Sequence, residues 1–176
     1  QSLDDVDGKR IGVTGCSGGG KSTLIAELAD RGFRTVAEPG RRLIARGIAP
    51  WDDLHGFLSA AADMARADLE SHRSTSEPVF YDRGLLDALA GLERLGAGRV
   101  ADILGKARPY ERLVFVVPPW PGIYVTDIAR RHTFDEAVEE YRHIVTLLPA
   151  LGYRPFELPR VSAGRRAACV LEALEI

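Results

Sequence analysis

The most informative chemistry in this sequence lies in a glycine-rich stretch that ends in a lysine and two hydroxyl residues. Residues 15–23 read GCSGGGKST and match the pattern G-x-x-x-x-G-K-[ST], directly after an apolar run. Glycines let the amides of such a loop turn inward and hold phosphate oxygens at the start of the next helix. Lys21 would then contact the β- and γ-phosphates of a nucleotide, and the Ser22 hydroxyl would bind Mg²⁺. The expected phosphate-binding residues are Gly15, Ser17, Gly18, Gly19, Gly20, Lys21, Ser22 and Thr23. A glycine-rich turn that binds nothing is the alternative.

Lysine is rare in this chain, which makes its presence in the motif more informative. The sequence has 23 Lys and Arg residues, of which only Lys9, Lys21 and Lys106 are lysines. One of the three therefore falls at the position where a compact ammonium group on phosphate is expected.

An acidic residue ends a second apolar run. Residues 78–84 read PVFYDRG, and an acid at such a strand end can hold Mg²⁺, which would make Asp82 the partner of Ser22. A plain helix cap is the alternative for Asp82. The adjacent Arg83 could contact a substrate phosphate or simply pair with a surface acid.

Glu38 follows a third apolar run, and the carboxyl ends of parallel strands line the active-site crevice in sheets of this kind. A carboxylate there can take the proton of a hydroxyl that attacks a γ-phosphate. Glu38 could equally be an ion-pair partner of Arg41, which we also expect near the substrate.

The segment 118–133 contains three prolines, has no clear helical or strand period, and is predicted to be a lid-like loop. Its Arg130 could reach the transferring phosphate and Arg131 the nucleotide, although both could be solvated loop charges. Trp51 and Trp120 could stack on a substrate ring or serve as packing.

Composition limits the possible functions. With 45% hydrophobic residues and a net charge of −2, the chain has material for a core and lacks the basic excess of a general nucleic-acid or membrane-surface binder. The longest uncharged stretch, residues 113–126, is shorter than the ~20 residues of a membrane span. Two cysteines and three early acids argue against a disulfide framework or a secretion signal. We expect one cytoplasmic domain over residues 1–176.

Short apolar runs alternate with helix-period segments along the whole chain, which is typical of a parallel α/β sheet. The predicted strands cover residues 10–14, 33–37, 79–81, 113–117 and 154–158. Helices are predicted after Lys21 until Gly32, over residues 54–69 and 85–95, between Thr133 and Pro149, and after Ser162.

These features together resemble one family, the small AAA-type predicted ATPases grouped with the ribosylnicotinamide-kinase domain of the NAD regulator. The resemblance rests on the loop 15–23, the Glu38…Arg41 pair, the VFYDRGL run, the VPPWP…YVTD segment with Arg130 and Arg131, and ALGY at 150–153. It implies a three-layer P-loop NTPase fold with a five-stranded parallel sheet in the order 2-3-1-4-5, ATP with Mg²⁺, and an arginine-bearing lid. It does not imply an acceptor.

Two departures from this family qualify the prediction. Pro39-Gly40 separates Glu38 from Arg41, and Leu58 lies in a helix where nucleoside kinases often carry a base-reading Gln. The leading hypothesis is a Mg·ATP-dependent kinase acting on an unidentified small-molecule acceptor. The alternative is an ATPase or nucleotide-dependent switch without such an acceptor.

Overall fold

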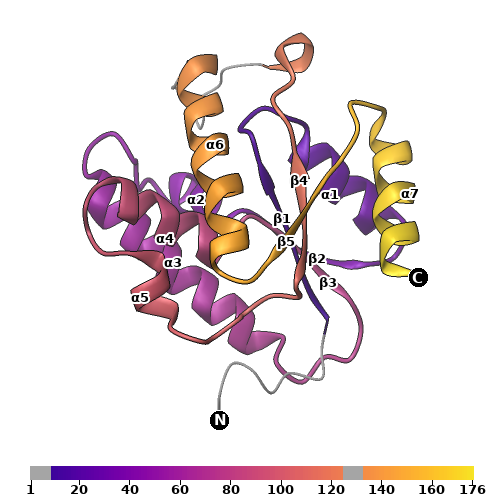
Figure 1. Cartoon of the computed structure of the whole chain (residues 1–176), viewed down its shortest axis with the longest axis horizontal. Coiled ribbons are helices and arrows are strands. Elements are labelled where there is room, and N and C mark those ends of the chain that lie inside the picture. The colour runs from indigo at the N-terminus through magenta and orange to yellow at the C-terminus, as the bar shows by residue number, and fades with distance from the viewer. Residues whose placement is uncertain (1–8, 125–132) are drawn as a thin grey trace.

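The five predicted strands form one parallel sheet. The computed structural model describes residues 9–124 and 133–176, and its strands are β1 (Arg10–Gly15), β2 (Arg34–Val36), β3 (Val79–Asp82), β4 (Leu113–Val117) and β5 (Arg154–Glu157). They pair in the order β2-β3-β1-β4-β5 (Figure 1), which confirms the predicted fold class and strand order. Central-strand residues such as Val13, Phe80 and Phe115 are fully buried, as expected for a parallel sheet covered on both faces.

Helices cover both faces of this sheet (Figure 1). On one face α1 (Lys21–Asp30) packs beside α7 (Ala163–Leu174). The opposite face carries α2 (Pro39–Ala45), α3 (Leu54–Ser71), α4 (Leu85–Arg94), α5 (Val100–Leu104) and α6 (Phe134–Ala150). None of the helices that the structure describes is both long and apolar enough to cross a membrane.

Local capping explains where the later helices begin. The Thr133 side chain accepts a hydrogen bond from the Glu136 amide, and the Ser162 side chain accepts one from the Arg165 amide, as the sequence predicts. Pro149 does not end α6, contrary to expectation. It lies in the last turn, and the chain leaves the helix after Ala150 through Gly152, whose φ of 90° suits a glycine.

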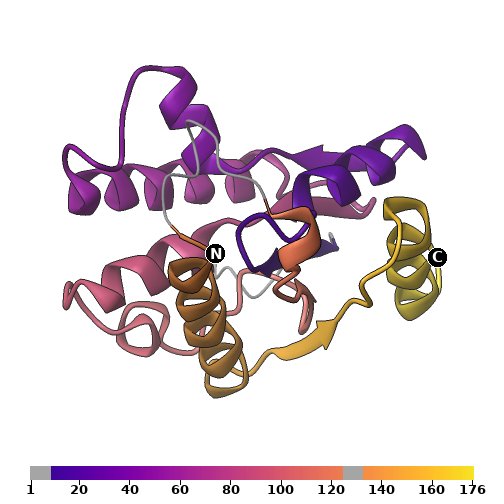
Figure 2. The same cartoon turned by 90° about the horizontal axis from the view of Figure 1, so that it is seen from above.

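Three short elements lie outside the predicted helix ranges, because they are shorter than the window over which periodicity can be recognised. They are α2, with seven residues, α5, with five residues, and the 3-10 helix η1 (Pro121–Ile123), which lies in the segment predicted to be a loop. Figure 2 looks down on the carboxyl edge of the sheet and shows η1 beside the glycine-rich loop. In this sheet β3 lies on one side of β1 and β4 on the other. The carboxyl edge at such a change of direction is the usual position of ligand sites in open α/β sheets.

Candidate functional site

The glycine-rich loop connects β1 directly to α1. Gly15 and Gly20 have φ angles of 123° and 93°, and a Cβ on Gly15 would lie 2.2 Å from the Val117 carbonyl oxygen. Glycine is therefore required for both the turn and the close approach to β4. Gly20 provides no side-chain cap to α1. The first amides of α1 are consequently available to an anion at the helix N-terminus.

Lys21 is buried at the centre of the loop. Its side chain is 6% exposed, and its Nζ donates a hydrogen bond to the Cys16 carbonyl oxygen at 2.8 Å. Burial, followed by the nearby Arg83 charge, lowers the pKa of Lys21 from 10.5 to about 8, against the attraction of Asp82, Glu38 and Asp87. At neutral pH the ammonium group remains charged, so the site holds an incompletely compensated cation.

Asp82 and Ser22 bring together two oxygen atoms that could bind a metal ion at the end of the loop. Ser22 Oγ lies 3.5 Å from Asp82 Oδ2, and the buried Asp82 Oδ1 has no hydrogen-bond partner among the described residues. Burial and then the Glu38 charge raise the pKa of Asp82. A hydroxyl and an unpartnered carboxylate oxygen are donors suited to Mg²⁺, which takes few protein ligands and fills its octahedron with water and phosphate. Within residues 9–124 and 133–176 no cluster of three His, Cys, Asp or Glu side chains offers another metal site.

Arg83 lies at the junction of several elements. Its guanidinium donates to Glu140 Oε1 at 2.5 Å and to the Gly15 carbonyl oxygen at 3.2 Å, and its Nε lies 3.9 Å from Glu38 Oε1. Burial alone would lower the pKa of Arg83, but the Glu140 and Glu38 carboxylates raise it. Its φ of 55° is unusual for a residue with a side chain, and these contacts hold it there.

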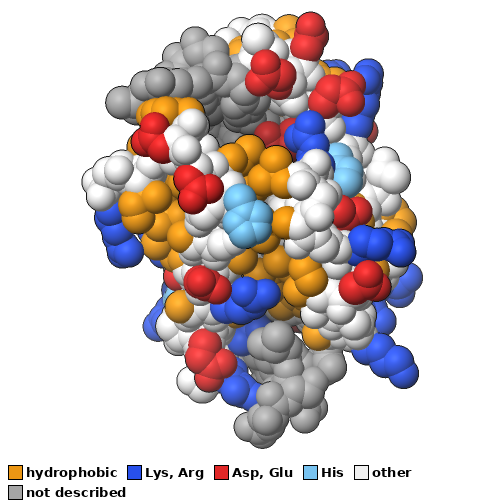
Figure 3. Space-filling model, turned by 90° about the vertical axis from the view of Figure 1, so that its left-hand side faces the viewer, with side chains coloured by type: hydrophobic (Ala, Val, Ile, Leu, Met, Phe, Trp, Pro, Cys, Tyr) orange, Lys and Arg blue, Asp and Glu red, His pale blue; other side chains and the backbone are white. Residues whose placement is uncertain are grey.

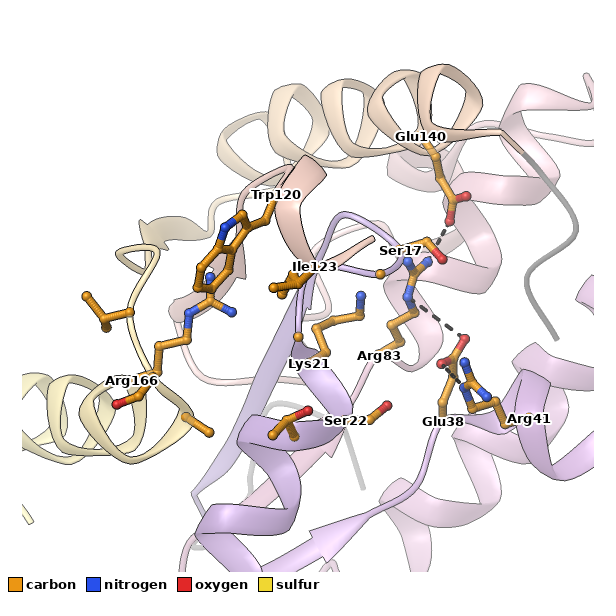
Figure 4. Close-up of a pocket in the computed structure, with 16 residues that line it drawn as sticks. Ser17, Lys21, Ser22, Glu38, Arg41, Arg83, Trp120, Ile123, Glu140 and Arg166 are labelled. Carbon is orange, nitrogen blue, oxygen red and sulfur yellow. Dashed lines mark hydrogen bonds and ion pairs between the residues drawn. The ribbon is translucent and has the colours of Figure 1, made fainter. Parts of the chain in front are cut away.

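A cavity of about 440 Å³ opens above the loop. Figure 4 shows Lys21 near its middle, Glu38 and Arg41 at one end, and Trp120 with Arg166 at the other. Arg166, which is 2% exposed, donates to the Gly19 carbonyl oxygen at 2.6 Å and to the Pro159 carbonyl oxygen at 2.8 Å. Its guanidinium carbon lies 5.0 Å from the Trp120 ring centroid, which is the distance of a cation–π contact.

A second cavity, of about 390 Å³, lies between α2, α3, α4 and α6. Glu38, Arg83 and Glu140 line both cavities, so these three side chains form the boundary between the two spaces. Beyond this boundary, most of the second cavity's wall is apolar, with Phe57, Leu58 and Ile144 among its side chains.

Comparison with known proteins agrees with this geometry. A family model described as an AAA domain matches residues 10–166 of the chain. The chain belongs to this AAA-domain family. The resemblance inferred from the sequence is therefore confirmed.

Solved structures similar to this AAA domain include kinases of small molecules. NadR in complex with NR shares 19% identity and a TM-score of 0.69, covering 96% of this chain and 52% of that one. Shikimate kinase from Acinetobacter baumannii with shikimate shares 16% identity and a TM-score of 0.62, covering 98% and 95%. Deoxyadenosine kinase from M. mycoides with dCMP and dCDP shares 14% identity and a TM-score of 0.61, covering 94% and 98%. At these identities the similarity establishes the shared fold. No match was found among curated proteins.

The fold of the AAA domain brings most of the predicted site residues together around the first cavity. These are Ser17, Gly18, Gly20, Lys21, Ser22, Thr23, Glu38, Arg41 and Arg83, with Gly15, Gly19 and Asp82 directly adjacent. Glu38 also makes the ion pair considered as its alternative role, with its Oε2 3.6 Å from Arg41 Nε. Arg83 likewise makes the ion pair considered as its alternative role, since it pairs with Glu140, whose side chain is 37% exposed, and with the less exposed Glu38. Arg130 and Arg131 lie outside the described residues.

Sequence reasoning missed Glu140, Asp87 and Arg166 of this AAA domain. Glu140 is a polar residue on an amphipathic helix, and such a residue is expected to face the solvent. Asp87 accepts hydrogen bonds from the Thr14 hydroxyl and the Gly84 amide, which supports the residues after β3. Of the two tryptophans, Trp120 reaches the first cavity, whereas Trp51 is 45% exposed and lines neither of the two cavities.

Proposed function

We propose that this AAA domain is an ATP-dependent phosphotransferase that moves the γ-phosphate of ATP to a hydroxyl group of a small molecule. The observation that carries the proposal is the pair of adjoining cavities, one at the phosphate-binding loop and one beyond Glu38. A hydrolase or nucleotide switch needs the first cavity but has no use for the second. Similarity to the folds of deoxyadenosine kinase and shikimate kinase supports this proposal without naming the acceptor.

In this proposal ATP occupies the first cavity with its phosphates on the loop. Lys21 and the amides of residues 15–23 hold the triphosphate, because they supply a buried positive charge and inward-facing donors. The adenine lies toward Trp120 and Arg166, where a flat aromatic and a planar guanidinium offer stacking surfaces. Ser22 and Asp82 would hold Mg²⁺, which when bound neutralises negative charge on the phosphates.

The acceptor hydroxyl would enter from the second cavity and meet the γ-phosphate beside Glu38. Its oxygen forms the new bond to phosphorus, the bond from phosphorus to the bridging oxygen of ADP breaks, and Glu38 takes the hydroxyl proton. Arg83 fixes Glu38 at the boundary from one side and Arg41 fixes it from the other. Arg130 and Arg131 are proposed to contact the phosphates from the segment 118–133. We place this activity in the cytoplasm, where the two free cysteines would remain reduced.

The proposal is tested by following ADP formation from Mg·ATP with a panel of hydroxyl compounds, using a coupled assay and the purified chain. Some panel member should raise ADP formation above the rate with Mg·ATP alone, and Lys21→Ala should abolish this increase. Lys106→Ala is the matched control, because Lys106 is exposed and lines neither cavity. Equal turnover by Lys21→Ala and the wild type would refute the proposal. ADP formation that no hydroxyl compound increases would favour the ATPase alternative.

A further inference from the structure

The second cavity differs in chemistry from the first. Its walls away from Glu38 are formed mainly by the apolar side chains and glycine of α3, α4 and α6, namely Leu54, Phe57, Leu58, Ala61, Ala88, Gly91 and Ile144. Phe57, Ala61, Ala88 and Ile144 are themselves buried, so this wall belongs to the packed core. Figure 3 shows hydrophobic side chains gathered on the side of the molecule that carries these helices, with charged side chains around them. The volume of about 390 Å³ lies within the range of small-molecule sites.

The polar groups of this cavity are unevenly distributed. Glu38, Arg83 and Glu140 belong to the boundary network, and the Asp87 carboxylate is engaged by the Thr14 hydroxyl and the Gly84 amide. Arg94 is exposed at the mouth. His143 also lines the cavity, and its Nε2 is buried without a hydrogen-bond partner among the described residues. Because that nitrogen is closed to solvent, it offers no hydrogen bond to a compound in the cavity.

These features disfavour a nucleobase in the second cavity. A base carries several donors and acceptors along its edge, and each one buried against an apolar wall loses its hydrogen bonds to water without replacement. Leu58, which lines this wall, has no hydrogen-bonding group in its side chain. An apolar ring or branched chain instead gains free energy from contact with Phe57, Leu58 and Ile144, in proportion to the area removed from water.

We propose that the acceptor is an uncharged alcohol with a compact apolar body. This inference rests on the proposed function, because it names the acceptor class for the same phosphoryl transfer. The hydroxyl lies toward Glu38, and the apolar body fills the space between Phe57, Leu58 and Ile144.

The experiment compares acceptor classes in two independent measurements. Benzyl alcohol and cyclohexanemethanol are compared with deoxyadenosine and shikimate. Binding is measured by saturation-transfer NMR, and phosphorylation by ³¹P NMR with Mg·ATP. We expect kcat/KM for the apolar alcohols to exceed that for deoxyadenosine and shikimate by about 10- to 100-fold, the effect of burying one hydrocarbon ring.

Two tryptophan variants locate the binding site. Leu58→Trp should fill the cavity and raise KM for the apolar alcohols at least tenfold, with KM for ATP unchanged. Ile103→Trp is the matched control, because Ile103 is 43% exposed on α5 and lines neither cavity. An unchanged KM for ATP shows that the Leu58→Trp variant remains folded.

The outcomes separate this inference from the proposed function. Phosphorylation of deoxyadenosine or shikimate in preference to the alcohols would overturn the acceptor class and leave the kinase proposal intact. If no compound is phosphorylated but the alcohols bind and Leu58→Trp abolishes that binding, the cavity assignment holds and the kinase proposal fails. Absence of alcohol binding, or binding that Leu58→Trp does not alter, would overturn the inference.

Discussion

Removing the charge of Lys21 should have opposite effects on activity and on stability. In the fold Lys21 is 6% exposed, and its ammonium group is charged at neutral pH with a pKa lowered to about 8. A lowered lysine pKa means that burial disfavours the charged form, and the folded state carries that cost when no phosphate compensates it. Lys21→Met keeps the length of the side chain and removes the charge. We therefore expect this variant to lose turnover and yet unfold at a higher temperature than the wild type.

The magnitude follows from the pKa. The fall from 10.5 to about 8 corresponds to about 3 kcal/mol, at roughly 1.4 kcal/mol per pKa unit. This figure already includes the attraction of Asp82 and Glu38, and it is an upper limit because the hydrogen bond from Nζ to the Cys16 carbonyl oxygen, worth about 1 kcal/mol, is also lost. A net gain of about 1–2 kcal/mol should raise Tm by about 2–8 °C in a domain of this size.

The pH dependence identifies the cause. Between pH 8 and 10.5 the folded wild type binds fewer protons at Lys21 than the unfolded chain does, so its stability rises with pH through this window. Below pH 8 the full cost is present. The advantage of Lys21→Met should therefore be largest at pH 7 and nearly absent at pH 10.5. Urea unfolding followed by circular dichroism at both pH values measures it, with Lys106→Met as the exposed control. A variant less stable than the wild type at pH 7, or a pH-independent difference, would refute the reasoning.

Three further predictions concern turnover. Glu38→Gln should lower kcat by about 10²- to 10⁴-fold because it removes the base, while calorimetric ATP affinity stays within about threefold; unchanged turnover would exclude Glu38 as the base. Arg166→Met should raise KM for ATP by about 3- to 30-fold through loss of the guanidinium beside Trp120, whereas the exposed Arg165→Met should not; equal KM values for the two variants would contradict the assigned adenine position. Because burial and Glu38 raise the pKa of Asp82 to about 6, kcat/KM for ATP should fall as pH drops through 6, where the carboxylate becomes protonated; a flat profile between pH 5 and 7 would count against Asp82 as a Mg²⁺ ligand.

The parts of the site that could be predicted from the sequence are those encoded locally. The phosphate-binding loop is contiguous, and its glycines and Lys21 carry their geometry in their own spacing. Glu38 and Asp82 could be predicted because each follows an apolar strand, and the carboxyl ends of parallel strands meet at one edge. The strand order came from the resemblance to a family, since spacing alone does not set the order.

The parts that could not be predicted depend on helix phase and on long-range packing. Arg165 and Arg166 are adjacent and chemically identical, yet Arg165 is exposed and Arg166 is 2% exposed against the loop. Their difference depends on how α7 packs against α1, which the local pattern does not contain. The place of Glu140 in the site likewise depends on its contact with Arg83, which lies 57 residues earlier in the chain. The second cavity arises between four helices, and no single segment of the sequence encodes it.

Several unfavourable features of the fold converge on the carboxyl edge of the sheet. Lys21 is a desolvated cation, Asp82 Oδ1 and Arg166 Nη2 are buried without partners among the described residues, and Arg83 has a backbone conformation that costs about 1–3 kcal/mol. An anion together with a cation at this edge would compensate the first three of these groups at once. If the role of Lys21 were purely structural, its replacement would lower the stability of the protein, and activity would fall as a consequence. If Lys21 binds a ligand, its replacement should lower activity while stability rises, because binding energy offsets local instability only when nucleotide is bound.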